Sequence, residues 1–381
     1  MNHLLELQRQ GQAIWMDYVR RGLITSGELK RLVEEDGLRG VTSNPTIFEK
    51  AIAETGDYDE TLHKLLDARA GSYDRALFEE LAVEDIQMAA DVLRGVYDKL
   101  DGADGFVSLE VAPDLAGDTA STIAEARRLW KEVSRPNVMI KVPATAEGIP
   151  AIESLLAEGI NINITLMFSM SHYEAVARAY LRGMERASNP RGVASVASFF
   201  VSRVDTAVDR ALEAIGAPEA LALRGKIAIA NAKIVYQRFR EIFHGDAFAA
   251  LRKRGARVQR PLWASTSAKN PAYSDVMYVE ELIGPETINT MPPATLNAFR
   301  DHGRARATLQ EGVKEAETAL ARLKQQGVDL NAITEQLQVD GVAAFTASFY
   351  QLLAAIEKKC KVIRATESGR NHEQTRRHGQ R

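Results

Sequence analysis

NVMIKVPAT (137–145) and seven similar apolar runs decide the fold of this 381-residue chain. The others, in chain order, are AIWMDYV (13–19), LRGVTSNP (38–45), GFVSLEV (105–111), INITLMFS (162–169), GVASVASFFVS (192–202), RPLWASTS (260–267) and TINTMPPAT (287–295). Short runs rich in Val, Ile, Leu and Phe are typical of strands that are buried on both faces. We therefore predict eight buried strands.

Helix-like stretches separate these runs. AGDTASTIAEARRLWKEV (116–133) has Asp118 and Thr119 where a helix would be capped, and SMSHYEAVARAYLRGMERA (169–187) has Ser169 or Ser171. Strands that alternate with helices form a parallel sheet with right-handed crossovers. Eight such units in about 280 residues favour a closed (β/α)8 barrel, the TIM barrel. An open doubly wound sheet is the alternative, but no GxGxxG follows the first run.

Two regions exceed this repeat. Residues 204–257 predict inserted helices before the seventh strand, and residues 303–364 predict two further helices after the eighth. We expect both sets to pack outside the barrel, so that residues 1–366 form a single domain. The last residues, 367–381, contain no strongly apolar side chain and predict an unstructured tail.

The composition limits the classes of partner. A net charge of −3 gives no reason to expect nucleic acid or an anionic membrane surface, and no run of about 18 consecutive apolar residues predicts a membrane span. The N-terminus lacks the uninterrupted apolar core of a signal peptide. Cys360 is the single cysteine, which fits a reducing cytoplasm, and the scattered histidines predict no metal site. The oligomeric state stays open, with a homodimer among the possibilities.

Lys141 is the most informative polar residue, because it lies between Ile140 and Val142 in a predicted buried strand. Burial disfavours a charged amine, and a neutral amine is the form that attacks a carbonyl carbon to give an imine. The alternative is a barrel-core lysine that forms a salt bridge with Glu110 or Asp17. Those two carboxylates end the third and first runs, so they could equally serve as general acid and base groups.

Other polar residues end further strands, where barrel enzymes carry their active sites. Asn44, in VTSNP at the end of the second run, lies just past the predicted strand, where a simple turn role is the alternative. Asn163 and Thr165 alternate so that both face one side. Asn163 and Thr165 suit sugar hydroxyls or an ordered water, or they satisfy each other inside the barrel.

An anion site is predicted after the sixth and seventh strands. Ser198, Phe200 and Arg203 belong to SFFVSR, and an arginine just after a strand can bind a phosphate or form a surface ion pair. Ser265, Ser267 and Lys269, in STSAKN, could complete the site, because barrels often bind phosphate late in the strand order.

Two segments carry a family resemblance. GVTSNPTIF (40–48) and NVMIKVPATAEGIPAI (137–152) resemble the signature segments of transaldolases, and the supporting residues occur in the same order. The resemblance runs from about residue 13 to about residue 300, and WASTSAKNPAYSD is similar to the longer bacterial branch. It implies a cofactor-free transferase of the pentose phosphate pathway. Such an enzyme moves a dihydroxyacetone unit from sedoheptulose 7-phosphate or fructose 6-phosphate to glyceraldehyde 3-phosphate or erythrose 4-phosphate.

The resemblance also implies roles for single residues. Lys141 would form the Schiff base, Glu110 would move protons through a water held by Thr165, and Asp17 would take the C4 hydroxyl proton. Asn44, Asn163 and Ser198 would bind hydroxyls, and Arg203 the phosphate. Shorter transaldolases carry Ser-Phe-Arg in the seventh-strand loop, where this chain has Ser265-Thr266-Ser267, so Lys269 is expected to replace the arginine charge.

Two other functions remain open from the sequence. A fructose-6-phosphate aldolase uses the same lysine, but that relative has an amide at the position of Glu110 and Tyr at the position of Phe200. A non-catalytic sugar-phosphate-binding barrel would bind the ligand without a covalent adduct.

Overall fold

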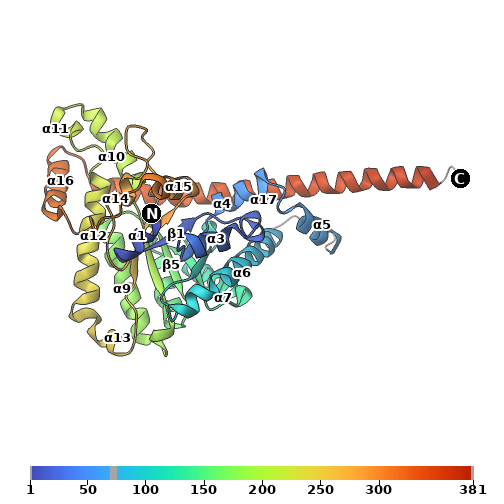
Figure 1. The fold of residues 1–381 in the computed structure, drawn as a ribbon, viewed down its shortest axis with the longest axis horizontal. Helices are drawn as coiled ribbons and strands as arrows, with labels where there is room; N and C mark the ends of the chain where they lie inside the picture. The colour runs from blue at the N-terminus through green and yellow to red at the C-terminus, as the bar shows by residue number, and fades with distance from the viewer. Residues whose placement is uncertain (1, 69–74, 379–381) are drawn as a thin grey trace.

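The computed structural model describes residues 2–68 and 75–378, and its centre is a closed barrel of eight parallel strands in the order β1 to β8 (Figure 1). The strands are Gln12–Asp17 (β1), Gly40–Thr42 (β2), Phe106–Glu110 (β3), Val138–Pro143 (β4), Ile162–Met167 (β5), Ser195–Phe200 (β6), Arg260–Ala264 (β7) and Thr287–Met291 (β8). Each lies within or next to one of the predicted apolar runs. The (β/α)8 prediction is therefore confirmed, and the open-sheet alternative is wrong.

Helices follow the strands and form the outer ring. The first half contains His3–Arg9 (α1), Arg21–Thr25 (α2), Glu28–Glu35 (α3), Pro45–Glu54 (α4), Asp59–Ala68 (α5), Arg75–Lys99 (α6), Thr119–Val133 (α7) and Gly148–Ala157 (α8). The second half contains Met170–Arg186 (α9), Ser202–Ile215 (α10), Pro218–Leu221 (α11), Ile227–His244 (α12), Ala249–Lys253 (α13), Met277–Glu280 (α14), Pro293–His302 (α15), Val313–Gln325 (α16) and Leu330–His378 (α17).

The predicted helix starts are confirmed at two positions. The Asp118 side chain accepts a hydrogen bond from the backbone N–H of Ser121 at the start of α7. Ser169, rather than Ser171, caps α9 by accepting from the backbone N–H of His172. In each case a side-chain oxygen satisfies an N–H group that the first helical turn leaves without a partner.

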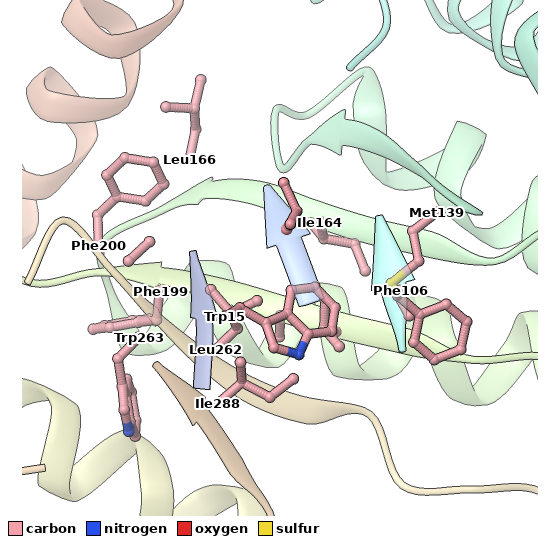
Figure 2. Close-up of a cluster of buried hydrophobic side chains, with 14 of the residues drawn as sticks. Trp15, Phe106, Met139, Ile164, Leu166, Phe199, Phe200, Leu262, Trp263 and Ile288 are labelled. Atoms are coloured by element: carbon pink, nitrogen blue, oxygen red, sulfur yellow. The ribbon is translucent and has the colours of Figure 1, made fainter. Parts of the chain in front are cut away.

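The barrel interior is filled by side chains. Trp15 is fully buried beside Phe106, with the two ring centres 6.4 Å apart (Figure 2). The indole N–H of Trp15 donates to Asp104. A Cβ atom on Gly40, the residue paired with Trp15 across β1 and β2, would lie 2.3 Å from the indole ring. Only glycine therefore leaves room for this tryptophan, which fills the barrel below the polar residues at the strand ends.

The extra helices pack on the barrel, as predicted. The inserted helices α10 to α13 precede β7, and α16 packs against α12. The last helix, α17, packs against α4. Its buried residues are spaced as one helical face and include Phe345, Phe349, Leu352, Ile356 and Cys360. Figure 1 shows α17 running across the barrel and then beyond it toward the C-terminus.

The predicted unstructured tail is wrong over most of its length. Helix α17 continues through His378, and the remaining tail residues, 379–381, lie outside the described residues. The segment contains no proline, and glutamate, glutamine and arginine are good helix formers. Adding residues to an existing helix also avoids the cost of nucleation. Low hydrophobicity alone was therefore a poor reason to end the helix at residue 366.

Part of α17 is long and apolar enough to cross a membrane by length and composition. Within the described residues, Leu330–Ala365 contains an 18-residue window of mean hydropathy 1.4, of which 28% is buried. Polar residues such as Thr346, Ser348 and Gln351 interrupt the apolar ones in this stretch.

Candidate active site

Strand register places the predicted polar residues at one end of the barrel. Lys141 on β4 is paired with Glu110 on β3 and with Asn163 on β5. Asp17 on β1 is paired with Thr42 on β2. Because all eight strands are parallel, these positions lie at the same carboxyl end, which is the end where TIM barrels carry their active sites.

Lys141 lies between two oxygen atoms. Its Nζ atom is 3.2 Å from Oε2 of Glu110 and 3.1 Å from the backbone carbonyl of Ser43, to which it donates. The side chains of Lys141 and Glu110 are each only 5% exposed. An amine and a carboxyl group in contact and out of water can exchange a proton directly, which is what general acid–base chemistry at an amine requires.

Both nearby carboxyl groups hold protons more strongly than usual. Burial raises the pKa of Asp17 above its ordinary value of 3.8, although Lys141 and the hydrogen bond from Thr42 act in the opposite direction. Burial also raises the pKa of Glu110 above 4.5, with Lys141 again opposing the rise. Raised values bring carboxyl groups closer to the range in which they both accept and release protons near neutral pH.

Asp17 is held by a short chain of hydroxyl groups. The Thr42 hydroxyl donates to Oδ1 of Asp17 at 2.7 Å and lies 2.7 Å from the hydroxyl of Thr290. Strands β1, β2 and β8 thus fix the carboxyl orientation. Asp17 also lines the cavity described below.

Asn163 does not reach the cavity as the sequence suggested. It is fully buried, where its amide donates to Ser108 at 3.0 Å and accepts from the Ser198 hydroxyl at 2.6 Å. Thr165 differs, because its hydroxyl is buried, has no hydrogen-bond partner and lines the cavity. A buried hydroxyl without a partner is costly and therefore indicates a site for a water or a ligand. Asn163 and Thr165 do not satisfy each other.

A cavity of about 420 Å³ opens above Lys141. All of the predicted site residues line it except Glu110 and Asn163, and further lining residues include Tyr18, Thr42, Thr46, Lys50, Thr290 and Phe345. Arg203, Lys269 and Lys50 bring three positive charges to its wall, whereas Asp17 is its acidic residue. Such a wall favours a ligand that carries a negative charge.

The cationic side of the cavity is built by α10 and the loop after β7. The Arg203 guanidinium lies 5.4 Å from the centre of the Phe200 ring. Burial, together with Arg203, lowers the pKa of Lys269, whose amine donates to the Ser267 hydroxyl at 2.7 Å. Ser265 adopts a left-handed conformation with φ of 56° and lies 2.9 Å, oxygen to oxygen, from Ser202 at the start of α10. The predicted phosphate-binding residues therefore do come together.

Asn44 caps a helix and also lies at the cavity. Its side-chain oxygen accepts from the backbone N–H of Ile47 and caps α4, which accounts for its position directly before Pro45. The residue also lines the cavity. The alternative of a simple turn residue is wrong, because Asn44 begins a helix.

Several cavity residues were not predicted from the sequence, among them Lys50 and Phe345. Lys50 follows Thr46 by four residues on α4, so both lie on one helical face, and this spacing could have revealed Lys50. Phe345 comes from α17, about 200 residues after Lys141, so no local sequence pattern places it beside the lysine. Among the described residues, no group of three or more His, Cys, Asp and Glu side chains is arranged to hold a metal ion.

Comparison with known proteins agrees with this geometry. The family model described as transaldolase/fructose-6-phosphate aldolase matches residues 14–356. The chain belongs to this family. It is 49% identical to the transaldolase of Thiobacillus denitrificans over 93% of this chain and 100% of that protein. It is 46% identical to transaldolase 2 of Nostoc sp. over 95% of this chain and 99% of that protein. It is 48% identical to transaldolase 1 of Streptomyces coelicolor over 93% of this chain and 94% of that protein.

Membership of the transaldolase/fructose-6-phosphate aldolase family confirms the resemblance drawn from the two signature segments. The match extends beyond β8 to residue 356 and so takes in most of the part of α17 that packs on α4. Full-length relatives named transaldolase also favour the longer bacterial type that the WASTSAKNPAYSD segment suggested.

Proposed function

We propose that this protein is a transaldolase that carries a dihydroxyacetone unit as a Schiff base on Lys141. The observation that carries the proposal is the buried contact between Lys141 and Glu110 at one side of a cavity whose other side is cationic. A nucleophilic amine with its own proton carrier suits a ketone, and the cations suit a phosphate. A ketose phosphate combines both groups.

Formation of the Schiff base requires several proton transfers. The Lys141 amine attacks the C2 carbonyl of the donor, and the resulting hydroxyl must leave as water. Glu110 lies within hydrogen-bond distance of that amine, and its raised pKa suits it to carry the proton. The hydroxyl of Thr165, which has no protein partner, is the natural holder of the water that links Glu110 to the leaving oxygen.

Cleavage of the C3–C4 bond requires a base at the C4 hydroxyl. Asp17, oriented by Thr42 and near enough to Lys141 for their charges to interact, is positioned to take this proton as the aldehyde product leaves. The electron pair moves into the protonated imine, which becomes an enamine on Lys141. The acceptor aldehyde then forms the new C–C bond, and the same steps in reverse release the product.

The remaining residues bind the substrate. Arg203 and Lys269 would hold the phosphate together with Ser265 and Ser267, and Lys50 adds a third positive charge at this wall. Asn44 and Ser198 would bind hydroxyls of the three-carbon unit. Asn163 would act indirectly, because its amide orients Ser198.

A fructose-6-phosphate aldolase is the second candidate, since the family includes both activities. Glu110 argues against the aldolase activity, because the aldolase carries an amide at that position. Phe200 also argues against it, because the aldolase has tyrosine there. A non-catalytic barrel would have no use for a cavity lysine in buried contact with a carboxyl group.

A transfer assay separates these functions. With fructose 6-phosphate alone, we expect little turnover, because the three-carbon unit has no acceptor. Addition of erythrose 4-phosphate should yield sedoheptulose 7-phosphate and glyceraldehyde 3-phosphate, with the latter measured by a coupled dehydrogenase. Release of free dihydroxyacetone at the same rate with and without the acceptor would instead identify an aldolase.

A further inference from the structure

Helix α17 brings an aromatic side chain to the reactive lysine. Phe345 is only 4% exposed and lines the cavity, and the centre of its ring lies 5.7 Å from the Nζ atom of Lys141. Glu110 and the Ser43 carbonyl occupy polar positions around the same amine. Lys141 is therefore bordered by polar groups of the barrel and by an apolar ring of the C-terminal helix.

The position of this ring is fixed at the β5 end of the barrel. Strand β5 is irregular after Ile164, and Leu166 adopts a left-handed φ of 60°. The Gln338 side chain on α17 donates to the carbonyl of Leu166 at 2.9 Å and to that of Ala144 at 3.0 Å. A Cβ atom at Gly341 would lie 2.9 Å from the Leu166 side chain, so a glycine permits this close approach. Irregular strands of this kind often occur beside active sites.

A second contact holds α17 on the other side of Phe345. The Thr46 hydroxyl, at the start of α4, donates to the Ser348 hydroxyl at 2.8 Å. Phe349, one turn after Phe345, packs edge-on against Phe78 of α6 with ring centres 5.8 Å apart. Contacts before and after Phe345 thus hold its ring over Lys141, and the helix does not merely cover the outside of the barrel.

The proposed reaction has a step at which water is harmful. After C3–C4 cleavage the three-carbon enamine must wait for an acceptor. If a proton adds to C3, the iminium of dihydroxyacetone forms. Water then adds at C2, the C–N bond breaks, the water oxygen becomes the ketone oxygen, and its two protons leave with the Lys141 amine. Free dihydroxyacetone is lost, and no transfer takes place.

We propose that the Phe345 ring keeps water away from the Lys141 enamine. It thereby sets the ratio of transfer to the acceptor aldehyde to loss as free dihydroxyacetone. An apolar ring excludes water from this side, whereas the Thr165 hydroxyl, which has no protein partner, and Glu110 beside the amine suit the water that Schiff-base chemistry needs. This inference rests on the proposed function. Phe345 is a specificity-determining residue in this account, because it decides between acceptor aldehyde and water.

The test measures a ratio rather than a rate. Wild type, Phe345→Leu and Phe345→Ala are assayed with fructose 6-phosphate and erythrose 4-phosphate, and both sedoheptulose 7-phosphate and free dihydroxyacetone are counted. Phe345→Leu keeps apolar bulk and guards against loss of folding, which circular dichroism checks. Tyr350→Leu, at an exposed position of the same helix, is the matched control.

The expected result is a graded change. Dihydroxyacetone per transfer event should rise about tenfold in Phe345→Ala, the change produced by roughly 1.4 kcal/mol of differential stabilisation. Phe345→Leu should show a smaller rise, and Tyr350→Leu should keep the wild-type ratio. An unchanged ratio in folded Phe345 variants, even with slower turnover, would overturn the inference alone. Wild-type protein that performs no transfer would overturn the proposed function and this inference with it.

Discussion

The contact between Lys141 and Glu110 has two possible uses at the scale of single residues. A buried ion pair can be structural, and such pairs contribute little net stability because desolvation offsets their attraction. Here the amine faces a cavity, and Glu110 has a raised pKa that burial causes. The carboxyl group therefore takes up a proton more easily than an exposed one does, which favours the catalytic use.

Glu110→Gln and Asp17→Asn should separate the two proton-transfer stages. Without the Glu110 carboxyl group, formation of the Lys141 adduct should slow by roughly 10²- to 10⁴-fold. Asp17→Asn should still form the adduct but fail to cleave it. Borohydride reduction with fructose 6-phosphate should then leave the whole six-carbon phosphate on the lysine, and mass spectrometry measures this directly.

The control for this pair is a thermal melt of each variant, because removal of one partner of a buried ion pair costs stability. A three-carbon adduct in Asp17→Asn, formed as fast as in wild type, would contradict the role of Asp17. Adduct formation at the wild-type rate in Glu110→Gln would contradict the role of Glu110.

Individual site residues could be predicted where strand alternation fixes direction. Lys141, Glu110 and Asp17 end buried strands, and a period of two places each toward the mouth. The burial of Asn163 could not be predicted, because alternation gives the direction of a side chain but not which neighbours it bonds. Phe345 could not be predicted either, since its contact with Lys141 depends on how a distant helix packs.

At the scale of elements, α10 both carries Arg203 and anchors the loop that carries Lys269. The Tyr278 hydroxyl donates to Asp205 at 2.9 Å, and the Tyr273 hydroxyl donates to Asp209 at 2.6 Å. Both tyrosines follow the Ser265–Lys269 segment in the chain. Buried carboxyl groups on α10 thus fix the loop relative to the helix.

Asp205 should make stability depend on pH. Burial is the main cause that raises its pKa from 3.8 to about 6, so the folded protein binds a proton there that the unfolded chain releases. The free energy of unfolding contributed by this group is therefore highest below pH 4 and falls as the pH rises to about 6. The difference in pKa corresponds to roughly 3 kcal/mol.

The variant Asp205→Asn isolates this effect, because a neutral amide can keep hydrogen bonds to the Ala228 N–H and to Tyr278. Urea unfolding of both proteins between pH 4 and pH 7 should show the variant gaining stability relative to wild type as the pH rises. Parallel curves for the two proteins would contradict an elevated pKa at Asp205.

Elements were predictable where hydrophobic periodicity or capping was strong. All eight apolar runs became strands, and Asp118 and Ser169 cap the helices that were expected to begin there. The C-terminal end of α17 was predicted wrongly, because a polar segment has a similar composition whether it forms a solvated helix or an irregular coil. The irregularity of β5 at Leu166 was also not predicted, because the apolar run INITLMFS gives no sign of it, and it lies where Gln338 of α17 contacts the strand.

At the scale of the whole molecule, barrel closure produces the site. Residues from β1, β4, β5 and β6, far apart in sequence, surround one cavity only because β8 pairs with β1. The inserted and C-terminal helices add the parts that a plain barrel lacks. Helix α10 supplies Arg203, the loop after β7 supplies Lys269, and α17 supplies Phe345. The outer helices therefore contribute residues to the cavity as well as packing against the barrel.

Covalent trapping tests the central claim most directly. The wild-type protein is incubated with fructose 6-phosphate, reduced with borohydride and digested, and the modified peptide is identified by mass spectrometry, with Lys141→Ala as a folded control. The account predicts a three-carbon adduct on Lys141 and none in the control. Absence of an adduct, or an adduct on Lys50 or Lys269 in the same cavity, would contradict it.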